Sequence, residues 1–246
     1  MKYLVSICFS LYILISISYA NNMTLIEQAS NYYKNNKFEN ALSLYESLHK
    51  KFPNNIDIIY NLGNTHFKLN NHGYAIGFYL KAIKWDPSNS DIRYNLSLAR
   101  ELVQSDSEQE NSIIYTILGW LRFLSINVSF NIMMILLLGF LATLRFIQLQ
   151  KFNRELLFNI LIVCGLFFIL SFSMFLHRYA HYSEEKGVVI TKKLAVYSGP
   201  SETLSILFYI HEGYEFRINK FAGDWIEIEL SNGFKGWAPI SGLFLI

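Results

Sequence analysis

Two long uncharged runs constrain this chain more than any other feature of its sequence. Residues 123–144 and 156–176 are runs of 22 and 21 residues without a charged side chain. A helix of about 20 apolar residues is long enough to cross a bilayer. The composition agrees, because only 16% of all residues are charged, whereas soluble domains carry about 25%. The sequence therefore predicts a transmembrane α-hairpin.

The connection between the two runs, residues 145–155, predicts which way the hairpin faces. It carries Arg145, Lys151 and Arg154 against one acidic residue, Glu155. An excess of Lys and Arg keeps a short loop in the cytoplasm, so both flanking parts of the chain are expected outside the cytosol. Neither run contains a charge that would mark an ion or proton pathway. A simple anchor is the better interpretation.

Residues 1–20 have the pattern of a secretory signal peptide. Lys2 precedes an apolar run that reaches Ile17, and the small residues Ser18 and Ala20 stand at the −3 and −1 positions of a cleavage site. The alternative is an uncleaved N-terminal membrane anchor. Both interpretations export the segment that follows, in agreement with the orientation predicted from the loop.

Residues 21–104 contain a 34-residue period. Gly63 falls on Ala29, Ala75 on Ala41, Tyr79 on Tyr45, Ala82 on Leu48 and Pro87 on Pro53. Small residues allow two antiparallel helices to approach closely, and proline ends the second helix because it cannot continue the hydrogen-bond ladder. The period and spacing resemble the tetratricopeptide repeat family, whose unit is a helix–turn–helix. Ile59 and His66 replace that family's usual Trp and Tyr.

The repeats predict an all-α solenoid with helices near 23–36, 39–51, 57–70, 73–86 and 91–104. Two repeats and one further helix are fewer than the three or so units that such arrays need. The module is therefore expected to need support from a partner or from itself.

The first helices of the repeats are predicted to form a concave protein-binding face. Its aromatic and amide side chains suit either an extended peptide or a partner helix, and ordinary packing between helices is an equally good interpretation of each. The family's clamp for a C-terminal carboxylate is not reproduced, since Asn64 alone matches it. The predicted residues are Ile26, Ser30, Tyr33, Tyr60, Asn64, Phe67, Tyr94 and Leu98.

Residues 105–122 are predicted to form a polar linker and a helix lying at the membrane interface. From residue 187 to 246 the pattern changes to short alternating runs separated by turns, which predicts a small all-β domain of about five strands. Asn232-Gly233 is a strong hairpin signal, expected to place positive φ at both residues.

This last segment resembles a bacterial SH3-type domain, on the positions of Gly199-Pro200, Gly213, Trp225, Gly233, Gly236 and Trp237. The resemblance implies a small SH3-like barrel that binds cell-wall peptides or other proteins. Tyr197, Trp225 and Trp237 are the candidate ligand-binding strip. The alternative for Trp237, and equally for Trp225, is that the side chain belongs to the domain core.

Several classes of function find no support in the sequence. Both cysteines, Cys8 and Cys164, lie in apolar runs, so no disulfide framework is expected. A net charge of +2 gives no electrostatic argument for nucleic acid. His177 and His181 have the spacing of metal ligands, but no third ligand has convincing spacing. We expect no metal, cofactor or catalytic residues, and hence no enzyme.

The order of signal peptide, repeats, membrane hairpin and SH3-type domain resembles the BatE proteins of bacterial aerotolerance operons. That resemblance implies a multidomain scaffold in the bacterial inner membrane with both folded domains facing the periplasm. It also implies protein partners, namely von Willebrand-type membrane proteins and a MoxR-type ATPase. The alternative function is a sensor or anchor that binds peptidoglycan and recruits a partner through its repeats.

Overall fold

The computed structural model describes residues 24–103, 125–149 and 154–246. These residues form two compact units. One contains most of the N-terminal helices together with the C-terminal sheet, and the other contains the apolar hairpin. The predicted combination of a helical repeat region, two candidate membrane helices and a small antiparallel sheet is confirmed. The predicted signal peptide and interfacial helix lie outside the described residues.

The N-terminal helices, which we call the helical module, follow the predicted repeat. A helix over 24–34 is followed by α2 (Phe38–Lys51), α3 (Ile56–Lys68), α4 (His72–Trp85) and α5 (Ser90–Val103). Ala29, Ala41, Ala75 and Ala82 are completely buried, and the ring of buried Tyr79 packs against Gly63. The small residues of the 34-residue period are thus the places where helices meet, as close packing requires.

His66 lies in an aromatic stack inside this module. Its ring stacks on Tyr74 at 4.9 Å and on Phe78 at 5.4 Å between centroids. It is only 6% exposed, and its Nδ1 has no hydrogen-bond partner. Because burial penalises the charged imidazolium, the pKa of His66 is lowered to about 4.

This burial predicts that acid destabilises the helical module. The unfolded chain binds a proton at His66 with a pKa near 6.5, well before the folded chain does. Stability is therefore lost as pH falls from about 6.5 to about 4, by about 3 kcal/mol. His66→Phe should flatten this part of the pH profile of the melting temperature. An unchanged profile in His66→Phe would contradict the assignment.

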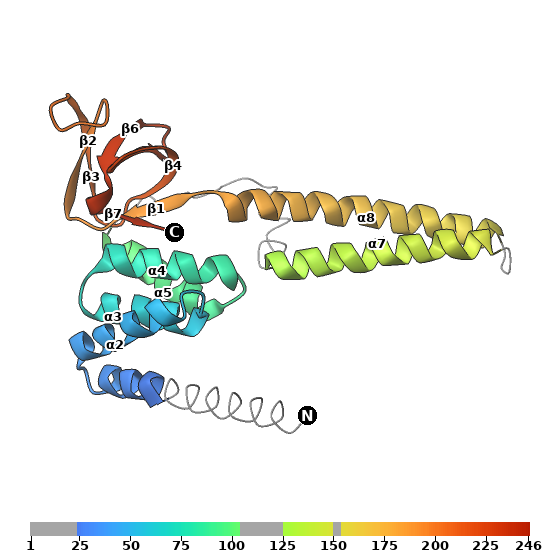
Figure 1. Ribbon diagram of the computed structural model, residues 1–246, viewed down its shortest axis with the longest axis horizontal. Helices are drawn as coiled ribbons and strands as arrows, with labels where there is room; N and C mark the ends of the chain where they lie inside the picture. The colour runs from blue at the N-terminus through green and yellow to red at the C-terminus, as the bar shows by residue number, and fades with distance from the viewer. Residues whose placement is uncertain (1–23, 104–124, 150–153) are drawn as a thin grey trace, which may run out of the picture. The chain divides into compact units, whose positions relative to one another are not determined.

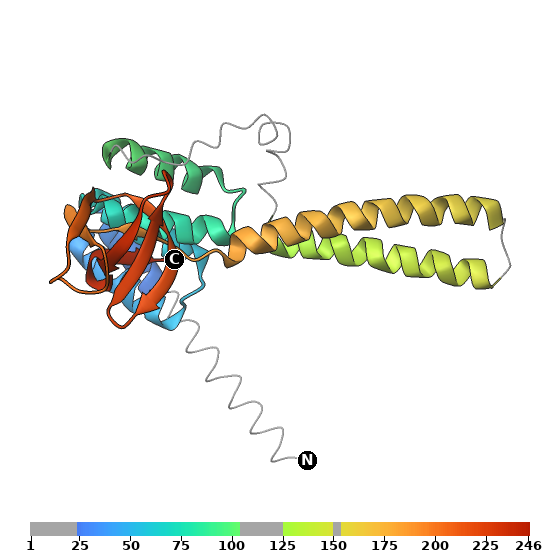
Figure 2. The ribbon, with the colours of Figure 1, turned by 90° about the horizontal axis from the view of Figure 1, so that it is seen from above.

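The apolar hairpin consists of α7 (Ile126–Gln148) and α8 (Arg154–Ser183), which run side by side and antiparallel (Figures 1 and 2). Ser125 begins α7 by accepting a hydrogen bond from the Val128 amide. Both helices are long and apolar enough to cross a membrane. Only 11% of the most apolar 18-residue stretch of α7 is buried, and only 6% of that of α8. Such exposure distinguishes them from core helices of a soluble domain, where apolar faces are covered.

The C-terminal segment, which we call the sheet domain, is a seven-stranded antiparallel sheet in the order β3-β2-β6-β5-β4-β1-β7. Ile226, Ile228 and Leu230 point into its core while Trp225, Glu227 and Glu229 face outward, as the alternation predicted. Its strands are β1 (Lys186–Val189), β2 (Lys193–Tyr197), β3 (Ile206–His211), β4 (Glu215–Ala222), β5 (Trp225–Leu230), β6 (Lys235–Pro239) and β7 (Leu243–Leu245).

Two details of this domain differ from the sequence prediction. There are seven strands rather than about five, because the short β1 and β7 pair with each other and extend the sheet beyond β4. At the β5–β6 hairpin, positive φ is found at Gly233 but not at Asn232. Asn232 instead accepts a hydrogen bond from the Phe234 amide with its side chain. The Leu230 amide donates to the Phe234 carbonyl, so the loop itself is residues 231–233. A three-residue loop of this kind needs only one left-handed residue.

The sheet domain and the helical module belong to one compact unit and are joined by charged contacts. Arg100 of α5 donates two hydrogen bonds to the Glu215 carboxylate, at 2.6 and 2.9 Å. The Gly73 amide, in the first turn of α4, donates to the Glu212 carboxylate at 2.7 Å. Two-point pairing of Arg with a carboxylate fixes geometry as well as adding energy, and a carboxylate is favourable at a helix N-terminus.

Apolar contacts complete this junction. The Phe244 ring of β7 lies directly over Gly77 and makes an edge contact with Phe78 at 4.8 Å between centroids. At the tight turn of Gly213 the backbone approaches Val103 of α5 and Ile76 of α4. The sheet domain therefore covers apolar surface that a short repeat array leaves open. The sequence predicted support from a partner or from the module itself, whereas here the contacts come from the C-terminal segment of the same chain.

Candidate binding surfaces

Five of the eight residues predicted for the concave face line one cavity of about 330 Å³ in the helical module. They are Tyr33, Tyr60, Asn64, Phe67 and Leu98. All of them are partly exposed, as a binding surface requires. The other three do not line it: Ile26 and Ser30 are partly exposed elsewhere on the first helix, and Tyr94 is 67% exposed.

A hydrogen-bonded network of two amides and two phenols lies at this cavity. The Tyr79 hydroxyl donates to Asn64 Oδ1 at 2.8 Å. The Asn95 amide donates to Asn64 Oδ1 at 2.9 Å and to the Tyr60 hydroxyl at 2.9 Å. These bonds link α3, α4 and α5, so the cavity wall has a fixed shape.

The Tyr79 hydroxyl is a neutral donor in this network. Burial raises its pKa far above the ordinary value, and the neighbouring phenols of Tyr60 and Tyr33 raise it further. The cavity is therefore lined by neutral hydrogen-bonding groups, with Lys68 as the one charged residue in its lining among the described residues. The wall suits a ligand that is itself rich in neutral polar groups.

Sequence reasoning missed three lining residues, Lys68, Tyr79 and Asn95. The 34-residue period selected Tyr94 because it is equivalent to Tyr60. A cavity between successive helices, however, is lined by opposite edges of those helices, so α5 contributes Asn95 instead. Asn95 directly follows Tyr94 in the sequence, so its side chain points to a different side of the helix. This offset is the signal that could have identified it.

The candidate strip on the sheet domain comes together on the outer face of three strands. Tyr197 of β2 lies directly opposite Trp237 of β6, and its ring meets Trp225 of β5 edge-on at 5.4 Å between centroids. All three side chains are partly exposed. Trp237 is thus not in the core, whereas its neighbours Gly236 and Ala238 are buried. Glu227, which sequence reasoning did not select, lies opposite Trp237 on β5.

Comparison with known families agrees with both modules. Residues 32–94 match the tetratricopeptide repeat family, and residues 191–243 match the bacterial SH3 domain family. The first match includes α3 and α4, which carry most of the residues that line the cavity. The second includes all three residues of the aromatic strip.

A segment of 78 residues is also 36% identical to YrvJ of Bacillus subtilis, a protein that carries the name of an N-acetylmuramoyl-L-alanine amidase. The shared segment is 32% of this chain and 15% of the relative, and it covers only the SH3 part. The likeness therefore concerns the sheet domain and not the rest of that protein.

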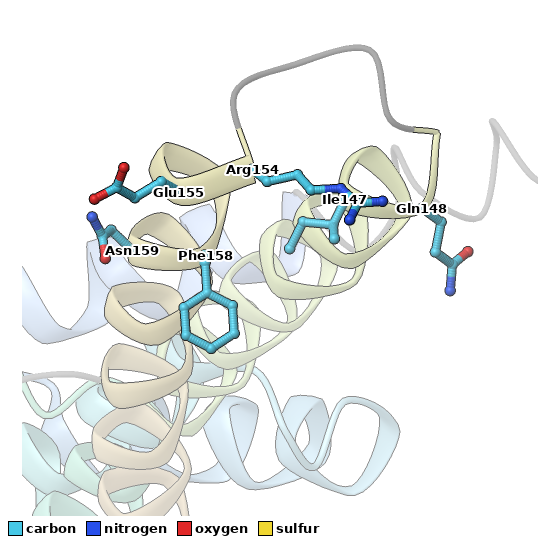
Figure 3. Close-up of a pocket in the computed structure, with 6 residues that line it drawn as sticks. All are labelled: Ile147, Gln148, Arg154, Glu155, Phe158 and Asn159. Carbon is cyan, nitrogen blue, oxygen red and sulfur yellow. The ribbon is translucent and has the colours of Figure 1, made fainter.

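A further pocket of about 510 Å³ lies where the hairpin turns, between the end of α7 and the start of α8. In Figure 3, Arg154 reaches toward Ile147 at the end of α7, while Glu155 and Asn159 point outward. The adjoining residues 150–153, including Lys151, lie outside the described part of the chain. Near the other end of α8, the side chain of His181 is also outside it, so the His177–His181 pair is not placed.

Proposed function

We propose that this chain is a non-enzymatic scaffold of the bacterial inner membrane that presents two protein-binding modules on the periplasmic side. The observation that supports it most is the junction of the helical module with the sheet domain. These segments are separated in sequence by the hairpin, yet Arg100 pairs with Glu215 in one compact unit. Two spans return a chain to the side from which it started, so the arrangement suits a hairpin anchor.

The benefit of such an anchor is concentration. A membrane-held platform confines both binding surfaces to a thin layer, so that contacts too weak to hold a freely diffusing partner become effective. In this proposal the partners are those implied by the resemblance to BatE proteins, von Willebrand-type membrane proteins and a MoxR-type ATPase, in an aerotolerance or stress complex.

Photo-cross-linking in cells tests the scaffold. A benzophenone amino acid at Tyr94, which is 67% exposed and directly precedes the cavity-lining Asn95, is expected to capture a membrane protein with a von Willebrand-type domain. The same amino acid at Lys51, which is exposed at the end of α2, is the control. Capture of the same proteins at both positions, or of none at Tyr94, would contradict the proposal.

The orientation has its own test. We expect a membrane-impermeant maleimide to label Ser231→Cys, in the exposed turn of the sheet domain, in spheroplasts. Lys151→Cys should be labelled only after permeabilisation, because its basic loop is proposed to be cytoplasmic. The reverse pattern would place both modules in the cytosol.

A second candidate function is a sensor or anchor that binds peptidoglycan. The similarity to the named amidase supports it, because that similarity lies in the sheet domain, which carries the strip of Tyr197, Trp225 and Trp237. The full chain in lipid nanodiscs should then sediment with purified cell-wall sacculi, and Trp225→Ala should release it. No sedimentation would leave the scaffold as the better proposal.

A further inference from the structure

We propose that the pocket at the turn of the hairpin binds the headgroup of an anionic phospholipid, with Arg154 as the residue that contacts the phosphate. The pocket lies where α7 ends and α8 begins, so it belongs to the two candidate membrane helices alone. The inference rests on the proposed function in one respect, because that proposal makes the hairpin a membrane anchor with this turn on the cytoplasmic side.

The guanidinium of Arg154 is the positive group of the pocket. In Figure 3 its side chain extends from the start of α8 toward Ile147 of α7. Among the described residues, none accepts a hydrogen bond from this guanidinium or pairs with its charge. A guanidinium carries five N–H donors in a planar fork, which can bond to two oxygens of one phosphate. The pocket therefore offers an unpaired cation of the right shape for a phosphate group.

The apolar part of the lining lies deeper in the span than Arg154. Phe158 belongs to the uncharged run 156–176 and is 58% exposed. It follows Arg154 by four residues, so the two side chains share one face of α8 and are about 6 Å apart along the helix axis. Ile147 lines the same pocket from α7. A phospholipid carries its acyl chains just below its phosphate, whereas a free phosphate ion has no group to place against Phe158. The order of the lining therefore favours a lipid.

The charge around the turn favours a headgroup with net negative charge. Residues 145–155 carry three basic residues and one acidic residue, a net charge of +2. The acidic residue, Glu155, lines the pocket but points outward in Figure 3. Gln148 accepts a hydrogen bond from Arg145 at 3.2 Å with its side-chain carbonyl, which leaves its NH2 group as a second donor at the pocket. Basic pockets between membrane helices on the cytoplasmic side suit anionic headgroups.

A lipid titration of the unaltered protein tests the assignment. The full chain in neutral detergent micelles is titrated with phosphatidylglycerol, phosphatidylethanolamine or phosphatidylcholine, and native mass spectrometry counts the lipids that remain bound. We expect phosphatidylglycerol to bind at least about tenfold more tightly than either zwitterionic lipid. Inorganic phosphate at the same concentrations should not displace it. Equal binding of the three lipids, or displacement by inorganic phosphate, would overturn the inference.

Two matched arginine variants assign the effect to the pocket. Arg154→Gln should weaken the binding of phosphatidylglycerol about tenfold, because it removes the charged fork. Arg145→Gln removes the same charge at the same end of the hairpin, but Arg145 is exposed and does not line the pocket. It should weaken binding by no more than about twofold, as expected for an exposed charge. Equal losses in the two variants would mean that the lipid responds only to the total charge of the turn.

A conservative variant keeps the test valid if Arg154→Gln fails to insert into the membrane. Arg154→Lys retains the positive charge that holds the loop in the cytoplasm. Its ammonium group is a point charge without the planar fork, so it should bind phosphatidylglycerol more weakly than the unaltered chain. Unchanged affinity in Arg154→Lys would contradict the two-point contact with the phosphate.

These results are distinguishable from failure of the proposed function. Reversed labelling of Ser231→Cys and Lys151→Cys would overturn the orientation, but the titration in micelles does not depend on which side the turn faces. Loss of the specific cross-links at Tyr94 would remove the scaffold and leave the lipid site. A hairpin that showed no preference among the three lipids would remove only the lipid site.

Discussion

Replacing Gly63 by alanine is expected to destabilise the helical module by about 1–3 kcal/mol, the usual cost of overpacking a core. A Cβ atom at this position would lie 2.6 Å from Tyr79 Cε1 and 2.7 Å from Cδ1. The Tyr79 ring is 1% exposed and its hydroxyl bonds to Asn64, so it has little freedom to move. Hydrogen exchange at the amides of α3 and α4 measures the loss.

The sign of this effect makes it diagnostic. At an unconstrained helix position, glycine to alanine stabilises by roughly 0.5–1 kcal/mol. A Cβ atom added to Gly139 of α7 would meet no atom within 4 Å, so Gly139→Ala is the control and should not destabilise its helix. If Gly63→Ala also proved neutral or stabilising, the close approach of α3 to Tyr79 would be wrong.

The second large effect is expected at Gly73, where alanine should separate the helical module from the sheet domain. Its Cβ would lie 2.5 Å from the Val189 carbonyl oxygen and 2.9 Å from Ile190 Cα. Both are backbone atoms, which cannot rotate aside as a side chain can. The hydrogen bond from the Gly73 amide to Glu212 should be lost as well. We expect at least about 1–3 kcal/mol of docking energy to be lost.

Hydrogen exchange separates this outcome from general unfolding. Amides of β7 and of the first turns of α4 should exchange faster in Gly73→Ala, while α2 and α3 keep their protection. Gly77→Ala should have a smaller effect on the same amides, because its Cβ meets the Phe244 ring. This side chain is partly exposed and can rotate away. Equal protection of β7 in Gly73→Ala and the unaltered chain would contradict the docked arrangement.

The sequence was a good guide to the elements and a partial guide to the surfaces. The 34-residue period located every helix of the helical module that the structure describes, because close helix contacts require small residues at fixed spacing. The alternation in β5 identified which side chains enter the core of the sheet domain. The turn at Asn232 was mistaken in type, since Asn-Gly occurs in more than one hairpin geometry and loop length selects among them.

What the sequence determined by itself is what repeats or alternates along the chain: the helices of the repeat, the apolar hairpin and the strands. Only the tertiary structure decided that Asn95 rather than Tyr94 reaches the cavity, and that the sheet domain supports the helices. The contacts responsible join residues 115 and 139 positions apart, Arg100 with Glu215 and Gly73 with Glu212. Periodicity reports the environment along one element, whereas such pairs depend on how separate elements pack, which no local pattern records.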